Sequence, residues 1–460
     1  MTTNDAIDRQ IHDCHFTHAG NAEALALLHG HIMRYVHGVG WHIWGVSHWK
    51  PDIDEQAKQL AKELARHRQK LIAGYEQDMK QKMAKMGMAV KMENTASILG
   101  CLNLAQSTPP FSCLPDDMDK ELMVLACPNG TLYTEYGFLT HPDPTMMITR
   151  CADVPYDEKA NAPRWKQFLR EVFVHPDGSP DEELIKYIKK ALGYSLTGDT
   201  RERCLFICIG EGANGKTTLF NIIKYILGSY AASIPFASLL ERKGDAQSND
   251  LAGLRGARFV TAVEAGQMKY LEEERVKELT GRDKIKCRFL YHEFFEYYPE
   301  FKLWMACNRK PRIRGTESAI WDRIKVIPFN NRFPPNGQDT DPEIDIKLQA
   351  EAPGILAWLV EGCKEWAEDG LTDCHTVKEA SRQYRHEEDC FMLFLDENIE
   401  ARPGSFVTVQ EVWQRHNRWA SMNGFEEIKN TVRMGREMAG KGYKAVRQHG
   451  QRGFKDIRFK

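Results

Sequence analysis

The chain has 460 residues, of which 42% are hydrophobic and 27% charged, and its formal net charge is −2. This length predicts about two to four domains of a globular protein, and the small net charge excludes a protein that is basic throughout, so any nucleic-acid-binding surface must be local. No apolar run approaches membrane length, the N-terminus lacks a signal-peptide pattern, and none of the 12 cysteines forms a Cys-x-x-Cys pair, which predicts a cytoplasmic protein with reduced thiols and no membrane partner.

The first 200 residues predict mainly helices. One helix is expected over residues 52–86, where apolar residues recur at helical spacing. Residues 122–136 predict a β-hairpin about the Asn129-Gly130 turn. A further helix is expected after Ser179, with Ser179 as its N-cap and Pro180 at the first helical position.

A glycine-rich motif follows. Residues 210–217 read Gly-Glu-Gly-Ala-Asn-Gly-Lys-Thr, which fits the phosphate-binding P-loop, between a predicted strand and a predicted helix. This order places backbone N–H groups and the helix N-terminus around phosphate oxygens. Lys216 is expected at the β- and γ-phosphates of ATP and the Thr217 hydroxyl at Mg²⁺. The alternative is a glycine turn that happens to precede a lysine, but it does not explain why a predicted strand comes directly before the motif and a predicted helix directly after it. The expected nucleotide contacts are Gly210, Gly212, Asn214, Gly215, Lys216, Thr217 and Thr218.

Two buried strands are predicted further on, over residues 258–264 and 301–307, and a polar residue stands at the end of each. Glu264 is placed to hold Mg²⁺ through water and to polarise the attacking water, and Asn308 to contact the γ-phosphate. The alternatives are an exposed glutamate at a strand end and an asparagine in a turn before Pro311.

A positive charge from a neighbouring subunit would complete such a catalytic site. Arg323, just before the apolar run 324–329, is the first candidate, and Arg312 and Arg314 are its rivals.

The chain becomes basic at its end. From residue 401 onward there are thirteen Lys and Arg against five Asp and Glu, a balance of +8. Two predicted helices, 408–420 and 426–439, precede a predicted hairpin, which is typical of a winged helix that binds duplex DNA. The alternative is a solvated basic face. The candidate DNA contacts are Arg433, Arg436, Lys441, Lys444 and Arg447.

The order of these motifs resembles the superfamily 3 helicases of the phage and plasmid primase–helicase type, which are relatives of the poxvirus primase–helicases. The stretches that carry the resemblance are 210–217, 256–264, 277–283, 288–291, 301–311 and 323–329, with further agreement from about residue 15 onward.

The resemblance implies an α/β P-loop NTPase core of the AAA+-like superfamily 3 helicase type over residues 179–370. A mainly helical domain, 1–178, would precede it and a small winged-helix-like domain, 371–460, would follow. It implies a homo-hexamer or similar ring with ATP between subunits, Arg323 acting on the ATP of the next subunit. Such a ring moves on single-stranded DNA and unwinds forked duplexes during replication, here in a bacterial host cytoplasm. The strands about residues 286–298 would form a hairpin in the pore, whose DNA contacts would be Arg288, Tyr291, His292 and Phe294.

This chain departs from the family in two places. Members commonly have Gly-Gly-Asp where it has Gly281-Arg282-Asp283, so this loop is expected to differ. Many members carry a primase or polymerase domain before the matching region, and here we expect that enzyme to be a separate partner. Two alternatives remain: an ATP-switched loader or initiator that binds DNA without processive unwinding, and a small-molecule kinase, against which the order of the later motifs and the basic tail argue.

Overall fold

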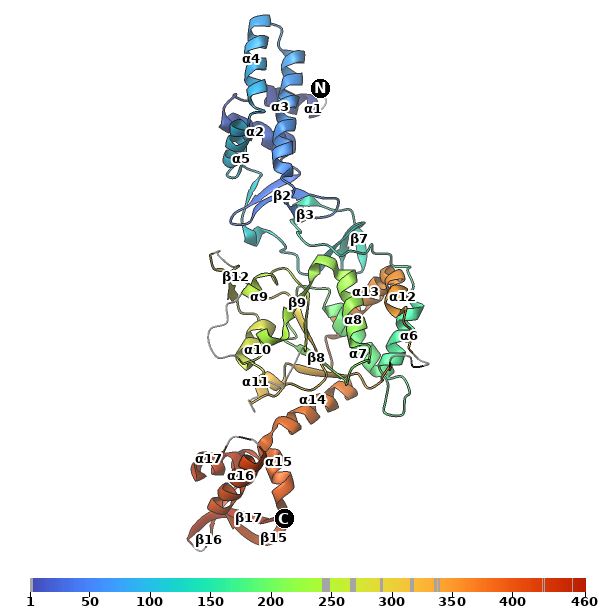
Figure 1. Cartoon of the computed structure of the whole chain (residues 1–460), viewed down its shortest axis with the longest axis vertical. Helices are drawn as coiled ribbons and strands as arrows, with labels where there is room; N and C mark the ends of the chain where they lie inside the picture. The colour runs from blue at the N-terminus through green and yellow to red at the C-terminus, as the bar shows by residue number, and fades with distance from the viewer. Residues whose placement is uncertain are drawn as a thin grey trace.

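The computed structural model describes residues 3–241, 249–264, 270–289, 293–314, 318–334, 337, 340–423, 425, 427–448 and 450–460. Figure 1 shows three parts in chain order along the long axis: a group of helices, a part built on a parallel sheet, and a C-terminal unit. Within the described residues, no helix is both long and apolar enough to span a bilayer.

The N-terminal part combines five helices with a small sheet of strand order β3-β2-β1-β4. The helices are α1 (Thr3–Asp13), α2 (His18–His29), α3 (Gln56–Tyr75), α4 (Met79–Lys91) and α5 (Thr95–Ala105), and the strands are β1 (Met33–Val36), β2 (Gly40–Trp44), β3 (Trp49–Pro51) and β4 (Ser112–Cys113). The expectation of one helix over 52–86 is wrong. Asp78 starts a second helix by accepting the backbone N–H groups of Lys80 and Gln81, a cap that apolar spacing does not reveal.

Five parallel strands form the central sheet, in the order β14-β8-β13-β10-β9. They are β8 (Leu205–Ile209), β9 (Ala231–Pro235), β10 (Phe259–Val263), β13 (Lys302–Cys307) and β14 (Ile324–Pro328). A parallel sheet is covered on both faces, so its strands are apolar runs, and every residue of β13 is buried. The α/β class expected from the sequence is confirmed.

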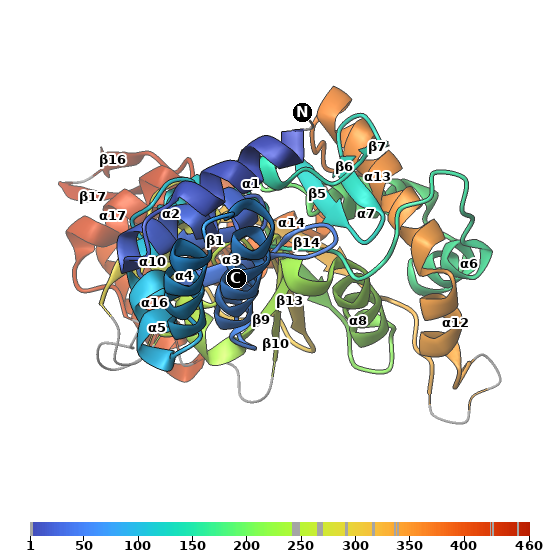
Figure 2. The same ribbon diagram turned by 90° about the horizontal axis from the view of Figure 1, so that it is seen from above.

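Helices cover both faces of this sheet. Since alternate residues of a strand point to opposite faces, Phe206 and Trp304 enter one core and Leu205 and Met305 the other. Figure 2 shows α6, α8 and α12 on one side of the strands and α10 on the other. The first face carries α6 (Pro163–Val172), α7 (Glu182–Tyr194), α8 (Lys216–Leu227), α12 (Ile344–Ala350) and α13 (Ala352–Asp369), and the second carries α9 (Asn249–Ala252), α10 (Glu273–Thr280) and α11 (Ser318–Trp321).

An antiparallel sheet joins the N-terminal part to the central part. Its strands are β5 (Val124–Cys127), β6 (Gly130–Tyr133) and β7 (Phe138–Thr140), and Cys127 pairs with Gly130, as the predicted hairpin requires. Side chains of β5, α6 and α7 share one core with α8. That core crosses residue 178, where the sequence led us to expect a boundary.

The N-cap of α7 is Asp181, and the expectation of Ser179 is wrong. The Asp181 Oδ1 atom accepts the Leu184 backbone N–H at 2.9 Å. Ser179 lies too early in the chain to cap this helix, because Pro180 forms a β-bridge with Val174 before the helix begins.

Two smaller antiparallel units complete the fold. One is the pair β11 (Ile285–Cys287) and β12 (Phe295–Tyr297). After α14 (His375–Glu388), which packs along the edge strand β14, the C-terminal unit has a separate hydrophobic core and the sheet order β15-β17-β16. Its elements are α15 (Cys390–Asn398), β15 (Ile399–Thr408), α16 (Val409–Asn423), α17 (Thr431–Gly440), β16 (Ala445–Gln448) and β17 (Gln451–Phe459).

Candidate functional site

The glycine loop lies between the carboxyl end of β8 and the first turn of α8. Gly212 and Gly215 have φ values of 90° and 86°, in the left-handed region where a side chain is strained. A Cβ atom on Gly215 would also lie 2.7 Å from the Val172 Cγ2 atom. The loop therefore needs glycine at this position for two independent reasons.

Lys216 is the central cation of the loop. It is only 6% exposed, and its Nζ atom donates to the Gly210 carbonyl at 2.5 Å and to Asn214 Oδ1 at 3.0 Å. Burial lowers the pKa of the Lys216 ammonium. Asn214 Nδ2 is buried and has no hydrogen-bond partner among the described residues. A buried ammonium held by neutral oxygens, beside an unpaired donor, fits a phosphate group.

Thr217 and Thr218 follow in the first turn of α8, where Thr217 is exposed and Thr218 half-buried. At a helix N-terminus the backbone N–H groups point outward without intrahelical partners. An exposed hydroxyl at this position can serve as an oxygen ligand of Mg²⁺. The structure thus places all seven expected nucleotide contacts in one loop and helix turn.

Glu264 and Asn308 meet at the same edge of the sheet. Their strands, β10 and β13, are neighbours, and β13 also pairs with β8. The Glu264 Oε2 atom accepts the Asn308 backbone N–H at 2.7 Å, and the Glu264 N–H donates to the Ala306 carbonyl at 2.9 Å. The Gly210 N–H donates to the Cys307 carbonyl at 3.3 Å. Hydrogen bonds therefore tie the glycine loop, the acid and the asparagine to the end of β13.

A cavity of about 430 Å³ opens beside the glycine loop. Its lining includes Lys310, Arg332 and Gln383, among other residues that the sequence reasoning did not assign to the site. Lys310 belongs to the stretch 301–311, which carries part of the family resemblance. Arg332 lies outside the helices and strands and Gln383 lies in α14, and only the folding of the chain brings these two residues close to the glycine loop. Lys310 Nζ is paired with Glu387 Oε2 at 2.7 Å.

Arg323 lies at the opposite edge of the sheet. Its carbonyl accepts the Leu205 N–H at 2.7 Å, at the start of β8. The glycine loop begins after the five residues of β8, about 16 Å away at roughly 3.3 Å per residue. Burial lowers the pKa of the Arg323 guanidinium, and Arg203 contributes in the same direction. Of its two rivals, Arg314 forms an ion pair with Glu241 at 3.4 Å.

The candidate hairpin is β11–β12. Arg288 and Phe294 contact each other across it, with the guanidinium carbon 4.7 Å from the ring centroid. Tyr291 and His292, the other two expected DNA contacts, lie outside the described residues.

The C-terminal candidates divide into two groups. Arg436, Lys444 and Arg447 are exposed, and Arg447 stands directly opposite Arg452 on the paired strands β16 and β17. Like charges in opposed positions are unfavourable without an anion between them. By contrast, Arg433 lies 3.7 Å from Glu437 and Lys441 is bound to Asp389. Lys441 would have to leave Asp389 before it contacted a phosphate.

Fold and site together define an α/β protein in which a glycine loop, a strand-end acid and a strand-end asparagine meet at one edge of a parallel sheet. Residues 22–174 match the family model described as "D5 N terminal like", and residues 208–323 match a "Family of unknown function (DUF5906)".

Viral proteins are similar to this chain. The Acanthamoeba polyphaga mimivirus protein named "Putative helicase L207/L206" is 25% identical over 67% of this chain and 34% of its own length. The Frog virus 3 protein named "Putative helicase 022R" is 28% identical over 58% of this chain and 29% of its own length. The African swine fever virus protein named "Putative primase C962R" is 22% identical over 62% of this chain and 31% of its own length. The chain spans about a third of the length of these relatives.

A solved structure, the apo form of the NrS-1 C terminal region (305-718), is 15% identical, covers 65% of this chain and 78% of that one, and has a TM-score of 0.42. The family models and the viral relatives confirm the resemblance to primase–helicases of the phage and viral type.

Proposed function

We propose that this protein is an ATP-driven DNA helicase that acts in replication as a ring of its own copies. The observation that carries the proposal is the position of Glu264, hydrogen-bonded to the end of β13 and one strand away from the glycine loop. An acid at this position is what hydrolysis at a P-loop requires. The names of the viral relatives, helicase and primase, support the same reaction class.

Each residue has a distinct task in this proposal. Lys216 and the loop N–H groups hold the β- and γ-phosphates, and Thr217 with Glu264 holds Mg²⁺. ATP with Mg²⁺ supplies the anhydride bond whose hydrolysis drives movement. Glu264 orients the attacking water, Asn308 contacts the γ-phosphate, and Arg323 of a neighbouring copy stabilises the charge that develops there.

The proposed DNA contacts lie in two places. The β11–β12 hairpin would grip a single strand. The C-terminal unit has the order helix, strand, helix, helix, strand, strand, which supports a winged helix with α17 in the major groove and the β16–β17 hairpin on the phosphates. Arg436 lies on α17 and Arg447 on β16, Lys444 directly precedes β16, and all three are exposed. A primase or polymerase would be a separate partner.

ATP hydrolysis tests the catalytic assignments. Lys216→Ala should lose nucleotide binding because the phosphates lose their buried cation. Glu264→Gln should still bind the nucleotide but turn over at least about a hundredfold more slowly. Equilibrium binding of a fluorescent ATP analogue and steady-state phosphate release measure the two effects. Lys70→Ala, on the exposed surface of α3, is the matched control and should equal the wild type. Wild-type turnover by Glu264→Gln would remove Glu264 from the mechanism.

Unwinding of a forked duplex separates a helicase from an ATP-switched loader. A helicase releases the displaced strand only when ATP is hydrolysed, so Glu264→Gln should release none. A loader would bind the fork in an ATP-dependent way and leave the strands paired, even where the wild-type chain hydrolyses ATP.

A further inference from the structure

Helix α4 has an apolar stripe that faces solvent. Met79, Met83, Met86 and Val90 follow one another at intervals of four, three and four residues, so they share one face of the helix. Met79 is 70%, Met83 72% and Val90 54% exposed, and Met86 is half-buried. An apolar stripe with this spacing normally packs against another element. Ala89 is the one buried residue of α4, so the described residues leave this α4 stripe largely uncovered.

The stripe lies on a projecting pair of helices. Figure 1 shows α4 beside α3 at one end of the molecule, well apart from the helix α8 that follows the glycine loop. Polar contacts hold the pair together, because Lys82 Nζ donates to the Ala73 carbonyl at 2.6 Å and Lys85 forms an ion pair with Glu76. We name the second half of α3 together with α4, residues 66–91, the α3–α4 arm.

The α3–α4 arm is basic, although the net charge of the chain is −2. Its 26 residues include seven Lys and Arg against two Asp and Glu, a balance of +5. Lys80 and Lys91 are exposed, and no carboxylate among the described residues pairs with either of them. They are eleven residues apart, which is about three helical turns. The two lysines therefore lie along the same side of the α4 stripe.

Charge and side-chain type together select one class of partner. Two arms would repel each other, because each carries the same positive balance. A nucleic acid would neutralise the lysines but leave the stripe uncovered, since the side chains that stack on bases are aromatic and the stripe contains only Met and Val. Helices that lie in a membrane surface use Trp, Phe and Leu there. A helix with acids beside an apolar face satisfies both the lysines and the stripe.

We propose that the α3–α4 arm binds an acidic amphipathic helix of another protein. The α4 stripe packs into the apolar face of that helix, and Lys80 and Lys91 pair with carboxylates about three turns apart on it. The unbranched Met side chains adapt to the shape of the partner. From Met79 to Val90 the stripe is about 16 Å long at 1.5 Å per residue, so the bound segment has at least about three turns. This interaction goes beyond the proposed helicase function and does not depend on it.

Fluorescence anisotropy of designed helical peptides with the full chain tests the proposal. The probe is a labelled peptide of about 18 residues, or about five turns, with Leu along one face and Glu and Ala elsewhere. Two control peptides have Lys in place of Glu, or the same composition in an order without an apolar face. The acidic amphipathic peptide should bind the wild type, and the two controls should not.

Substitutions on α4 locate the binding surface. Met79→Gln with Met83→Gln removes half of the stripe but keeps the helix, because Gln and Met have similar helix propensities. The affinity should fall at least about tenfold, since burying one such side chain is worth about that factor or more. Met422→Gln, at a position 79% exposed on α16, is the matched control and should bind as the wild type does. Lys80→Glu with Lys91→Glu should weaken binding of the acidic peptide and create binding of the basic one.

Four results would overturn the proposal. The wild type does not bind the acidic peptide, or all variants bind it equally well. Sedimentation shows self-association that Met79→Gln with Met83→Gln abolishes, which would make a second copy the occupant. Phosphatidylglycerol vesicles bind the wild type but not this variant, which would make it a membrane surface. ATP hydrolysis and unwinding should be unchanged in every α4 variant, so failure here leaves the proposed function untouched.

Discussion

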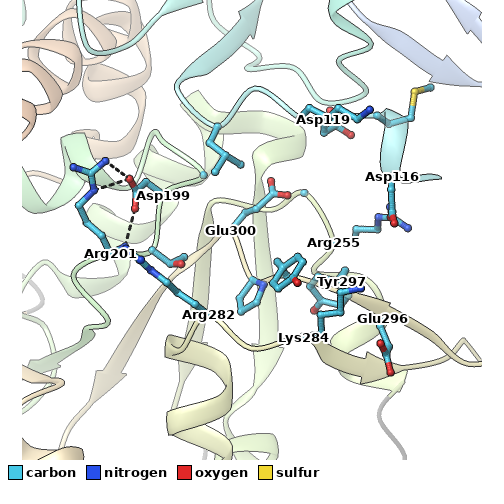
Figure 3. A pocket seen from close by; sticks show the side chains of 18 residues that line it. Asp116, Asp119, Asp199, Arg201, Arg255, Arg282, Lys284, Glu296, Tyr297 and Glu300 are labelled. Carbon is cyan, nitrogen blue, oxygen red and sulfur yellow. Dashed lines mark hydrogen bonds and ion pairs between the residues drawn. The ribbon is translucent and has the colours of Figure 1, made fainter. Parts of the chain in front are cut away.

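Glu300 is an acid whose environment opposes its charged form. It lines the cavity of Figure 3 and lies just before β13, and burial raises its pKa to about 7. In the unfolded chain the pKa is near 4.5. The folded state therefore holds the proton more tightly, and folding stability falls as pH rises from about 4.5 to about 7 and is constant above that. The loss is on the order of 3 kcal/mol.

Glu300→Gln tests this assignment because glutamine does not titrate. Relative to wild type, the variant should be more stable at pH 8 than at pH 5, which the thermal unfolding midpoints at the two values would show. Lys302, whose pKa burial lowers to about 7, lies beside Glu300, since its Nζ atom donates to the Glu300 carbonyl at 3.3 Å, so the comparison includes the interaction between the two charges. If the stability of the variant relative to wild type is the same at pH 5 and pH 8, Glu300 is solvated in the folded protein.

The helix α14 supports the segment next to the site. Its Tyr384 hydroxyl donates to the Pro311 carbonyl, its Glu388 carboxylate accepts the Ile313 N–H at 2.9 Å, and Glu387 pairs with Lys310. These contacts fix the segment that follows Asn308. Tyr384→Phe leaves the buried Pro311 carbonyl without a donor, which should cost about 1–3 kcal/mol and lower ATP turnover while nucleotide affinity stays close to wild type. Tyr225→Phe, on the exposed side of α8, is the control. Turnover equal to wild type would show that α14 does not position Asn308.

The sequence predicted the strands of the central sheet better than it predicted the ends of the helices. Each strand of the central sheet except β9 and each polar strand end came from local patterns, because a buried parallel strand is a continuous apolar run. Helix ends were harder to place. The helix expected over 52–86 is divided at Asp78, which caps α4, and a capping carboxylate leaves no mark in hydrophobic periodicity. The cavity wall was also beyond reach, since Gln383 is far from the glycine loop in sequence and only tertiary packing joins them.

For the whole molecule, the position of Arg323 at the far edge of its own sheet predicts an active site shared between copies. Lys216→Ala and Arg323→Ala subunits, each inactive alone, should regain part of the ATPase activity when they are mixed, since some interfaces then pair an intact loop with an intact arginine. The arginine should contribute about 10³–10⁵ in rate. Mixing Lys216→Ala with Glu264→Gln is the control and should restore nothing, because both changes damage the same side of the interface.

Two results would decide against this arrangement. One is the absence of activity in rings shown by differently tagged subunits to be mixed. The other is ATP hydrolysis at the wild-type rate by Arg323→Ala alone. Arg312 and Arg314 would then be the remaining candidates for the arginine supplied by the neighbouring copy.

The junction after α14 has a thermodynamic consequence. Asp389 holds Lys441 of the C-terminal unit, and its chain neighbour Glu388 holds the segment after Asn308. A duplex phosphate that bound Lys441 would compete with Asp389 for this lysine. Because Asp389 is adjacent to Glu388, which holds the segment after Asn308, such binding would also affect the proposed nucleotide site. Such coupling is reciprocal by necessity. If the protein binds both ligands as proposed, the factor by which ATP changes the affinity for duplex must equal the factor by which duplex changes the affinity for ATP, so titrations in the two orders should give the same factor.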